Sequence, residues 1–140
     1  MTLAVAAMLY TTGCVKKDTD TTPPVADILT PVNGQQFPVN CDSCGILLNA
    51  ELTDDVLLSE YKIEIHSAAG HGSHVSLLRA STTVWAFDTI VSLAGKSNAT
   101  IDLSILLKNV SDTGAFHFLL YVTDKAGNEV LEERDIVLKK

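Results

Sequence analysis

The chain has 140 residues, of which 46% are hydrophobic and 19% are charged, and its formal net charge at pH 7 is −7. This length allows about one domain plus a leader, and the composition excludes a disordered chain. The acidic balance argues against binding to nucleic acid or to an anionic membrane surface, and it is compatible with binding of cations.

The N-terminus resembles the export signal of a lipoprotein. Residues 2–10 are almost wholly apolar, but a bilayer-spanning helix needs about 20 such residues. Small residues then precede Cys14, and this order is similar to the lipobox of bacterial lipoproteins. The resemblance implies a signal peptide over residues 1–13 and a lipid anchor on Cys14, which would hold the protein at the outer membrane or cell surface.

Residues 14–24 have the composition of a tether. They contain lysine, aspartate, threonine and two prolines, without apolar periodicity. The charged stretch Lys17-Asp18, with Asp20, is similar to the surface-export signal of Bacteroidetes lipoproteins.

Residues 25–140 alternate polar and apolar side chains in short segments separated by turn residues, and no long helix is indicated. We expect about seven strands, over residues 25–31, 45–52, 57–66, 83–93, 99–107, 116–123 and 129–138. This spacing is typical of an all-β, immunoglobulin-like antiparallel β-sandwich.

Several motifs resemble known families. Residues 122–128 (VTDKAGN) resemble the strand–turn signature of bacterial immunoglobulin-like repeats, and residues 52–55 (LTDD) resemble their loop between the second and third strands. With Pro23-Pro24, residues 61–66 (YKIEIH), the histidine-rich loop and residues 114–117 (GAFH), the whole chain resembles the uncharacterised Bacteroidetes lipoprotein family DUF4625. The resemblance implies a lipoprotein with an immunoglobulin-like domain, and the family has no known function that could be carried over to this chain.

The four histidines are expected to converge. His66 ends the third expected strand, His71 and His74 follow in a glycine-containing loop, and His117 begins the sixth expected strand. In an immunoglobulin topology these strands pair antiparallel, so His66 and His117 should meet on the polar face. Because imidazole favours zinc, copper or nickel, we expect a metal site at these four residues. The alternatives are a solvated histidine-rich loop and a proton-linked role without metal.

Cys41 and Cys44 lie in the connection before the second expected strand, which should share the histidines' end of the sandwich. Three interpretations stay open for this pair: a local disulfide, thiolate ligands in a mixed cysteine–histidine metal site, or unpaired thiols.

Asp54, Asp55 and Asp124 are expected at the opposite end. Their carboxylates would suit calcium, but most such aspartates only cap β-turns, so calcium is not expected.

Motifs of catalysis are absent from the sequence, which has no nucleophile elbow, phosphate loop or HExxH segment. Glu64 shares a strand face with His66 and is a candidate hydrogen-bond partner of a metal-bound histidine, or a base in a metal-dependent hydrolase. A solvated glutamate is the commoner case, so no enzyme is predicted. We expect a metal-binding envelope lipoprotein; the alternative is a metal-free surface module for adhesion or for a glycan or protein ligand.

Overall fold

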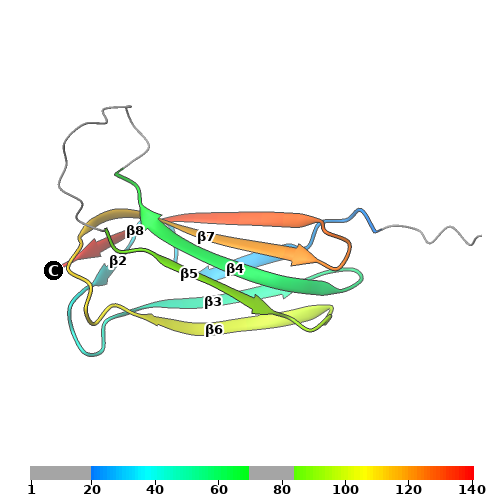
Figure 1. Ribbon diagram of the computed structural model, residues 1–140, viewed down its shortest axis with the longest axis horizontal. Coiled ribbons are helices and arrows are strands. Elements are labelled where there is room, and N and C mark those ends of the chain that lie inside the picture. Colours follow the sequence, from blue (N-terminus) through cyan, green and yellow to red (C-terminus); the bar gives the residue numbers. More distant parts are fainter. Residues whose placement is uncertain (1–19, 70–83) are drawn as a thin grey trace, which may run out of the picture.

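The computed structural model describes residues 20–69 and 84–140, and the regular structure in these residues is entirely β-strand (Figure 1). The eight strands are β1 (Val25–Thr30), β2 (Gln35–Pro38), β3 (Gly45–Thr53), β4 (Leu58–Ser67), β5 (Phe87–Ser92), β6 (Asn98–Leu106), β7 (Gly114–Asp124) and β8 (Glu129–Lys139). They form a three-stranded sheet in the order β1-β3-β6 and a five-stranded sheet in the order β2-β8-β7-β4-β5. The two sheets pack face to face, which confirms the expected all-β sandwich.

Alternation of buried and exposed side chains explains why these segments are strands. In β4, Ile63 and Ile65 are fully buried, while Glu64 between them faces away from the core. In β7, Phe116 and Phe118 face inward in the same way. The inward side chains of both sheets form one hydrophobic cluster, and burial of each large apolar side chain contributes about 1.5–3 kcal/mol.

The expected strand count was too low, because β2 was missed. This strand has four residues, only Phe37 among them is buried, and it ends in Pro38, so it carries too short a pattern for detection. It pairs parallel with β8 at the edge of the five-stranded sheet, which is therefore mixed and not purely antiparallel.

The strand expected from residue 83 begins only at Phe87. The backbone N–H of Trp85 donates to the Asp112 carboxylate, at 2.9 Å, instead of to a neighbouring strand. The Trp85 ring packs against the core, with its centroid 5.9 Å from that of Phe116.

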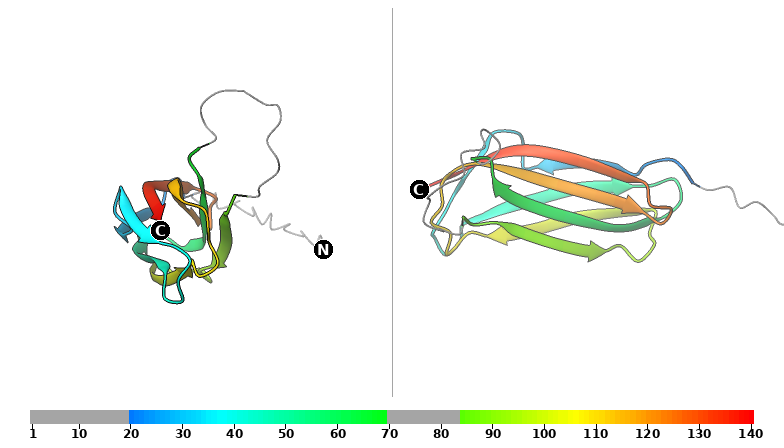
Figure 2. Two further views of the ribbon diagram at one scale, coloured as in Figure 1. Left: turned by 90° about the vertical axis from the view of Figure 1, so that its left-hand side faces the viewer. Right: turned by 45° about the horizontal axis from the view of Figure 1, so that its top comes forward.

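Antiparallel pairing gives the sandwich two ends with different loops (Figure 1 and Figure 2). At the histidine end, β4 finishes at Ser67 and β7 begins at Gly114. At the N-terminal end, β7 finishes at Asp124 and the chain leads from residue 20 into β1. Within residues 20–69 and 84–140, no helix is long and apolar enough to cross a bilayer.

Replacement of one core leucine should measure how much the packing contributes. Leu120 in β7 is 0% exposed, so we expect Leu120→Ala to lower the free energy of unfolding by about 2–5 kcal/mol. Leu106, which is 65% exposed, is the matched control, and Leu106→Ala should stay within about 0.5 kcal/mol of the parent protein. Urea denaturation measures both values, and equal losses in the two variants would contradict the assigned core.

Candidate functional site

His66 and His117 are direct partners in the antiparallel ladder between β4 and β7. Their ring centroids lie 5.6 Å apart, and both residues are partly buried. Both side chains point to the outer face of the five-stranded sheet, because Phe116 and Phe118 on either side of His117 occupy the core. The expected meeting of these two histidines is therefore confirmed.

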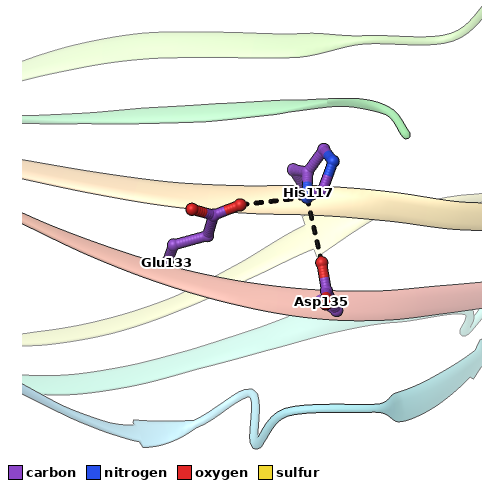
Figure 3. Close-up of side chains that lie close together, drawn as sticks. All are labelled: His117, Glu133 and Asp135. Atoms are coloured by element: carbon purple, nitrogen blue, oxygen red, sulfur yellow. Dashed lines mark hydrogen bonds and ion pairs between the residues drawn. The ribbon is translucent and has the colours of Figure 1, made fainter. Parts of the chain in front are cut away.

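Strand β8 adds two carboxylates that the sequence analysis did not include. Asp135 is the ladder partner of His117, and its Oδ1 lies 2.9 Å from His117 Nδ1. Glu133, two residues earlier on the same face of β8, places its Oε1 3.0 Å from the same nitrogen (Figure 3). Ligand atoms from all three side chains lie within 4.8 Å of one another.

A signal for Asp135 was present in the sequence. Hairpin register follows from the length of the turn, and here Thr123 pairs with Glu129 across the turn. Counting outward from that pair places Asp135 opposite His117. The β1–β2 turn then fixes the Asp135 backbone: its N–H donates to the Asn33 side chain at 2.7 Å, and its carbonyl accepts from Gly34 N–H at 2.6 Å.

One imidazole nitrogen therefore faces two carboxylates. Nδ1 carries at most one proton, so it can donate a strong hydrogen bond to only one of them at a time. The carboxylates of Glu133 and Asp135 are 53% and 63% exposed, so small rotations can change their distance from His117. Tetrahedral ligands about 2.0–2.1 Å from zinc lie roughly 3.4 Å apart, and the two carboxylate oxygens here lie 3.0 and 2.9 Å from His117 Nδ1.

Two shallow depressions lie over β7 on the same outer face. Between them sits Leu119, which faces outward but is only 8% exposed because β4 and β8 flank it. The depression beside the histidines has a volume of about 350 Å³ and is lined by His66, His117, Leu119, Leu131 and Glu133. The second has a volume of about 270 Å³ and is lined by Glu60, Lys62, Glu64, Tyr121, Thr123 and Glu129.

Glu64 lies on the outer face as expected, but its contact is with Lys62, with which it forms a hydrogen-bonded ion pair. The hydrogen bond from Lys62 lowers the pKa of the Glu64 carboxyl, although burial acts in the opposite direction. The same contact raises the pKa of Lys62. A carboxylate with a lowered pKa is a weaker base, so this ion pair disfavours the role of base considered for Glu64.

Cys41 and Cys44 form a disulfide, with their Cα atoms 5.2 Å apart. The bridge precedes β3 at the histidine end, as expected. Because neither sulfur is a thiolate in this state, the pair does not contribute metal ligands, and that interpretation of the cysteines is wrong for this structure. Cys14, His71 and His74 lie outside the described residues, so their roles stay predictions.

At the N-terminal end, Asp54 and Asp124 approach each other as expected, but the third carboxylate is that of Asp20 and not of Asp55. Asp124 caps its turn: its Oδ1 accepts from three successive backbone N–H groups, those of residues 126, 127 and 128, at 2.6–2.8 Å. Burial raises the pKa of this carboxyl, but these bonds and one from the Asn128 side chain outweigh it and lower the pKa.

A family model described as "Domain of unknown function (DUF4625)" matches residues 12–139 of the chain. A search of curated proteins found no match to the chain.

The Lys62–Glu64 contact can be tested by titration. Lys62→Met removes the hydrogen-bond donor, so the pKa of Glu64 should rise toward its ordinary value. Tyr121→Phe is the matched control and should produce a smaller rise, because Tyr121 contributes less to the lowered pKa. Carboxyl ¹³C chemical shifts followed against pH report the value directly, and an unchanged pKa in Lys62→Met would refute the assigned cause.

Proposed function

We propose that this chain, which belongs to the family described as domain of unknown function DUF4625, is a lipid-anchored envelope protein that binds a transition-metal ion at the histidine end of its outer sheet face. The observation that carries the proposal is His117 Nδ1, which lies within 3.0 Å of carboxylate oxygens from both Glu133 and Asp135. The ring of His66 lies beside it.

The donor chemistry supports a transition metal. Two imidazoles and two carboxylates form a mixed nitrogen and oxygen set, which suits zinc, copper or nickel better than calcium or magnesium. The ring centroid of His66 lies 5.6 Å from that of His117, but His66 is not among the three side chains whose ligand atoms lie within 4.8 Å of one another, so its ring would have to turn to reach the same ion. The ion would replace the proton on His117 Nδ1, which the carboxylates of Glu133 and Asp135 would otherwise share as hydrogen-bond acceptors.

The scaffold supports a preorganised site. The four side chains come from β4, β7 and β8, which are adjacent strands held in register by backbone hydrogen bonds. Sites built on such elements hold their ligands more rigidly than sites built on loops. The neighbouring depression lined by Leu119 and Leu131 leaves space on one side of the site.

The location in the envelope rests on sequence features and on chemistry. The apolar run before Cys14 supports export and lipidation. The Cys41–Cys44 disulfide suits a compartment outside the reducing cytosol. Because the chain enters the sandwich at the N-terminal end, the metal site would lie at the end away from the anchor.

Metal binding can be tested by calorimetric titration of the EDTA-stripped protein with zinc, copper(II) and nickel, together with elemental analysis. We expect about one ion per chain for at least one metal, with affinity that rises with pH because the ligands must lose protons. His117→Ala, His66→Ala and Asp135→Asn should each lose roughly tenfold or more in affinity, which corresponds to about 1.4 kcal/mol.

Asp102→Asn is the matched control, because Asp102 is an exposed carboxylate on β6 in the other sheet. It should bind metal like the parent protein. The double variant His71→Ala/His74→Ala measures what the histidines after β4 add to the affinity. If none of the three metals binds stoichiometrically, or if the double variant His66→Ala/His117→Ala keeps full affinity, the proposed function is wrong.

A metal-free binding module is the second candidate function, and the depression around Tyr121 favours it. An aromatic ring among charged and hydroxyl side chains can stack on a sugar ring while polar groups bind its hydroxyls.

This second candidate predicts glycan or protein binding that survives EDTA. Tyr121→Ala should then weaken the interaction about tenfold, since a stacked aromatic group contributes on the order of 1 kcal/mol or more. Glycan arrays and pull-down experiments with His117→Ala as the control measure it. Loss of binding in EDTA or in the control would favour the metal-dependent function instead.

A further inference from the structure

The Cys41–Cys44 bridge takes no part in the proposed metal site. Two residues separate the cysteines, and their turn is also closed by the backbone, because Cys44 N–H donates to the Cys41 carbonyl at 3.2 Å. Leu107 holds both sides of this turn. Its carbonyl accepts from Asn40 N–H at 2.9 Å, and its own N–H donates to the Cys44 carbonyl at 2.8 Å. The local fold is therefore supported without the sulfur bond.

A bridge across so short a loop adds little to the stability of the domain. In the chain-entropy account a disulfide restricts the unfolded state, and this effect decreases with the number of residues that the bridge encloses. The chain on either side of the turn is anchored in the core, where Val39 and Leu107 are buried. We therefore expect the sandwich to keep its structure when the bond is reduced.

The two cysteines differ in their access to solvent. Cys41 is exposed, as are Asp42 and Ser43 after it, whereas Cys44 is 2% exposed and belongs to the hydrophobic core. A thiolate from solution can therefore reach the bridge at Cys41. A reduced Cys44 would stay in place, since a free cysteine packs in a core like a small apolar side chain.

Lys108 brings a cation to the same turn. Its Nζ lies 2.7 Å from Asp42 Oδ1, so it offsets the negative charge that would repel an incoming thiolate. The two side chains are 57% and 87% exposed, and an ion pair in water is weak. The ammonium group is thus free to turn toward a thiolate at Cys41, and neighbouring cations stabilise the thiolate form.

We propose that Cys41 and Cys44 form a thiol–disulfide exchange site, whose substrate is a thiol on a small molecule or on a protein. The substrate thiolate attacks Cys41 Sγ, the bond to Cys44 breaks, and Cys44 leaves as a thiolate that takes up a proton. A second substrate thiolate then attacks the substrate sulfur of the mixed disulfide and releases Cys41, which is protonated in turn. Two thiols are oxidised to one disulfide, and the cysteine pair gains two electrons and two protons.

Equilibration in glutathione buffers tests the reaction, with the full chain carrying Cys14→Ser so that only this pair reacts. We expect oxidised and reduced protein to coexist over a range of glutathione ratios, and the reduced form to have a Tm within a few degrees of that of the oxidised form. Thiol alkylation with mass spectrometry measures the reduced fraction, and calorimetry measures the Tm.

A parallel arm with reduced thioredoxin distinguishes the two kinds of substrate. Reduction by glutathione supports a small thiol, and reduction by thioredoxin alone supports a protein dithiol. A pair that stays oxidised with both reductants, as structural disulfides do, would overturn the proposal. So would a pair that is reduced only under conditions in which the domain unfolds.

Single-cysteine variants test the direction of attack. Glutathione disulfide should react with Cys41 in Cys44→Ser at least about tenfold faster than with Cys44 in Cys41→Ser, because Cys44 is buried. Equal rates would contradict attack at Cys41. Lys108→Glu should slow the reaction of Cys41, whereas Lys96→Glu, the same change of charge at an exposed residue between β5 and β6, should leave its rate unchanged.

Discussion

The register of β7 between β4 and β8 is the constraint on which the outer face depends. It places His66, His117 and Asp135 in one row across three strands. A slip of one residue would turn every side chain of β7 to the opposite face, exposing Phe116 and Phe118 and burying His117. Exposure of the two phenylalanines alone would cost about 3–6 kcal/mol, at 1.5–3 kcal/mol for each. Core packing therefore fixes the positions of the histidine and its acidic neighbours.

The same constraint explains what the sequence could predict. Period-two alternation is local, so it identifies most strands. The strand pairing of an immunoglobulin topology then predicts that His66 lies beside His117, as it does. Strand β2 has too few residues to show alternation. Glu133 was overlooked because an acidic residue on a strand face is usually only solvated. Asp20 could not be predicted, since its place depends on how an irregular segment crosses the end of the sandwich.

The two ends of the domain differ in the ligand atoms that they bring together. The histidine end offers imidazole nitrogen with carboxylate oxygen, and the N-terminal end offers carboxylate oxygen alone. His117 and Asp124 are seven residues apart on β7, which corresponds to roughly 23 Å at about 3.3 Å per residue. Because this distance is several times the Debye length of about 8 Å at physiological ionic strength, charge at one site is largely screened from the other. A change of charge at one end should therefore alter the field at the other end only slightly.

The two groups of side chains also differ in how firmly the fold holds them. At the histidine end, neighbouring strands position the backbone of the four described residues of the proposed site, so this part of the site is in place when the sheet folds. At the N-terminal end, only Asp124 is fixed by a full set of hydrogen bonds, while Asp20 belongs to a segment held by two long contacts from Asn128. An ion at the histidine end would therefore leave the backbone of β4, β7 and β8 unchanged, whereas the chain at Asp20 depends for its position on the contacts from Asn128.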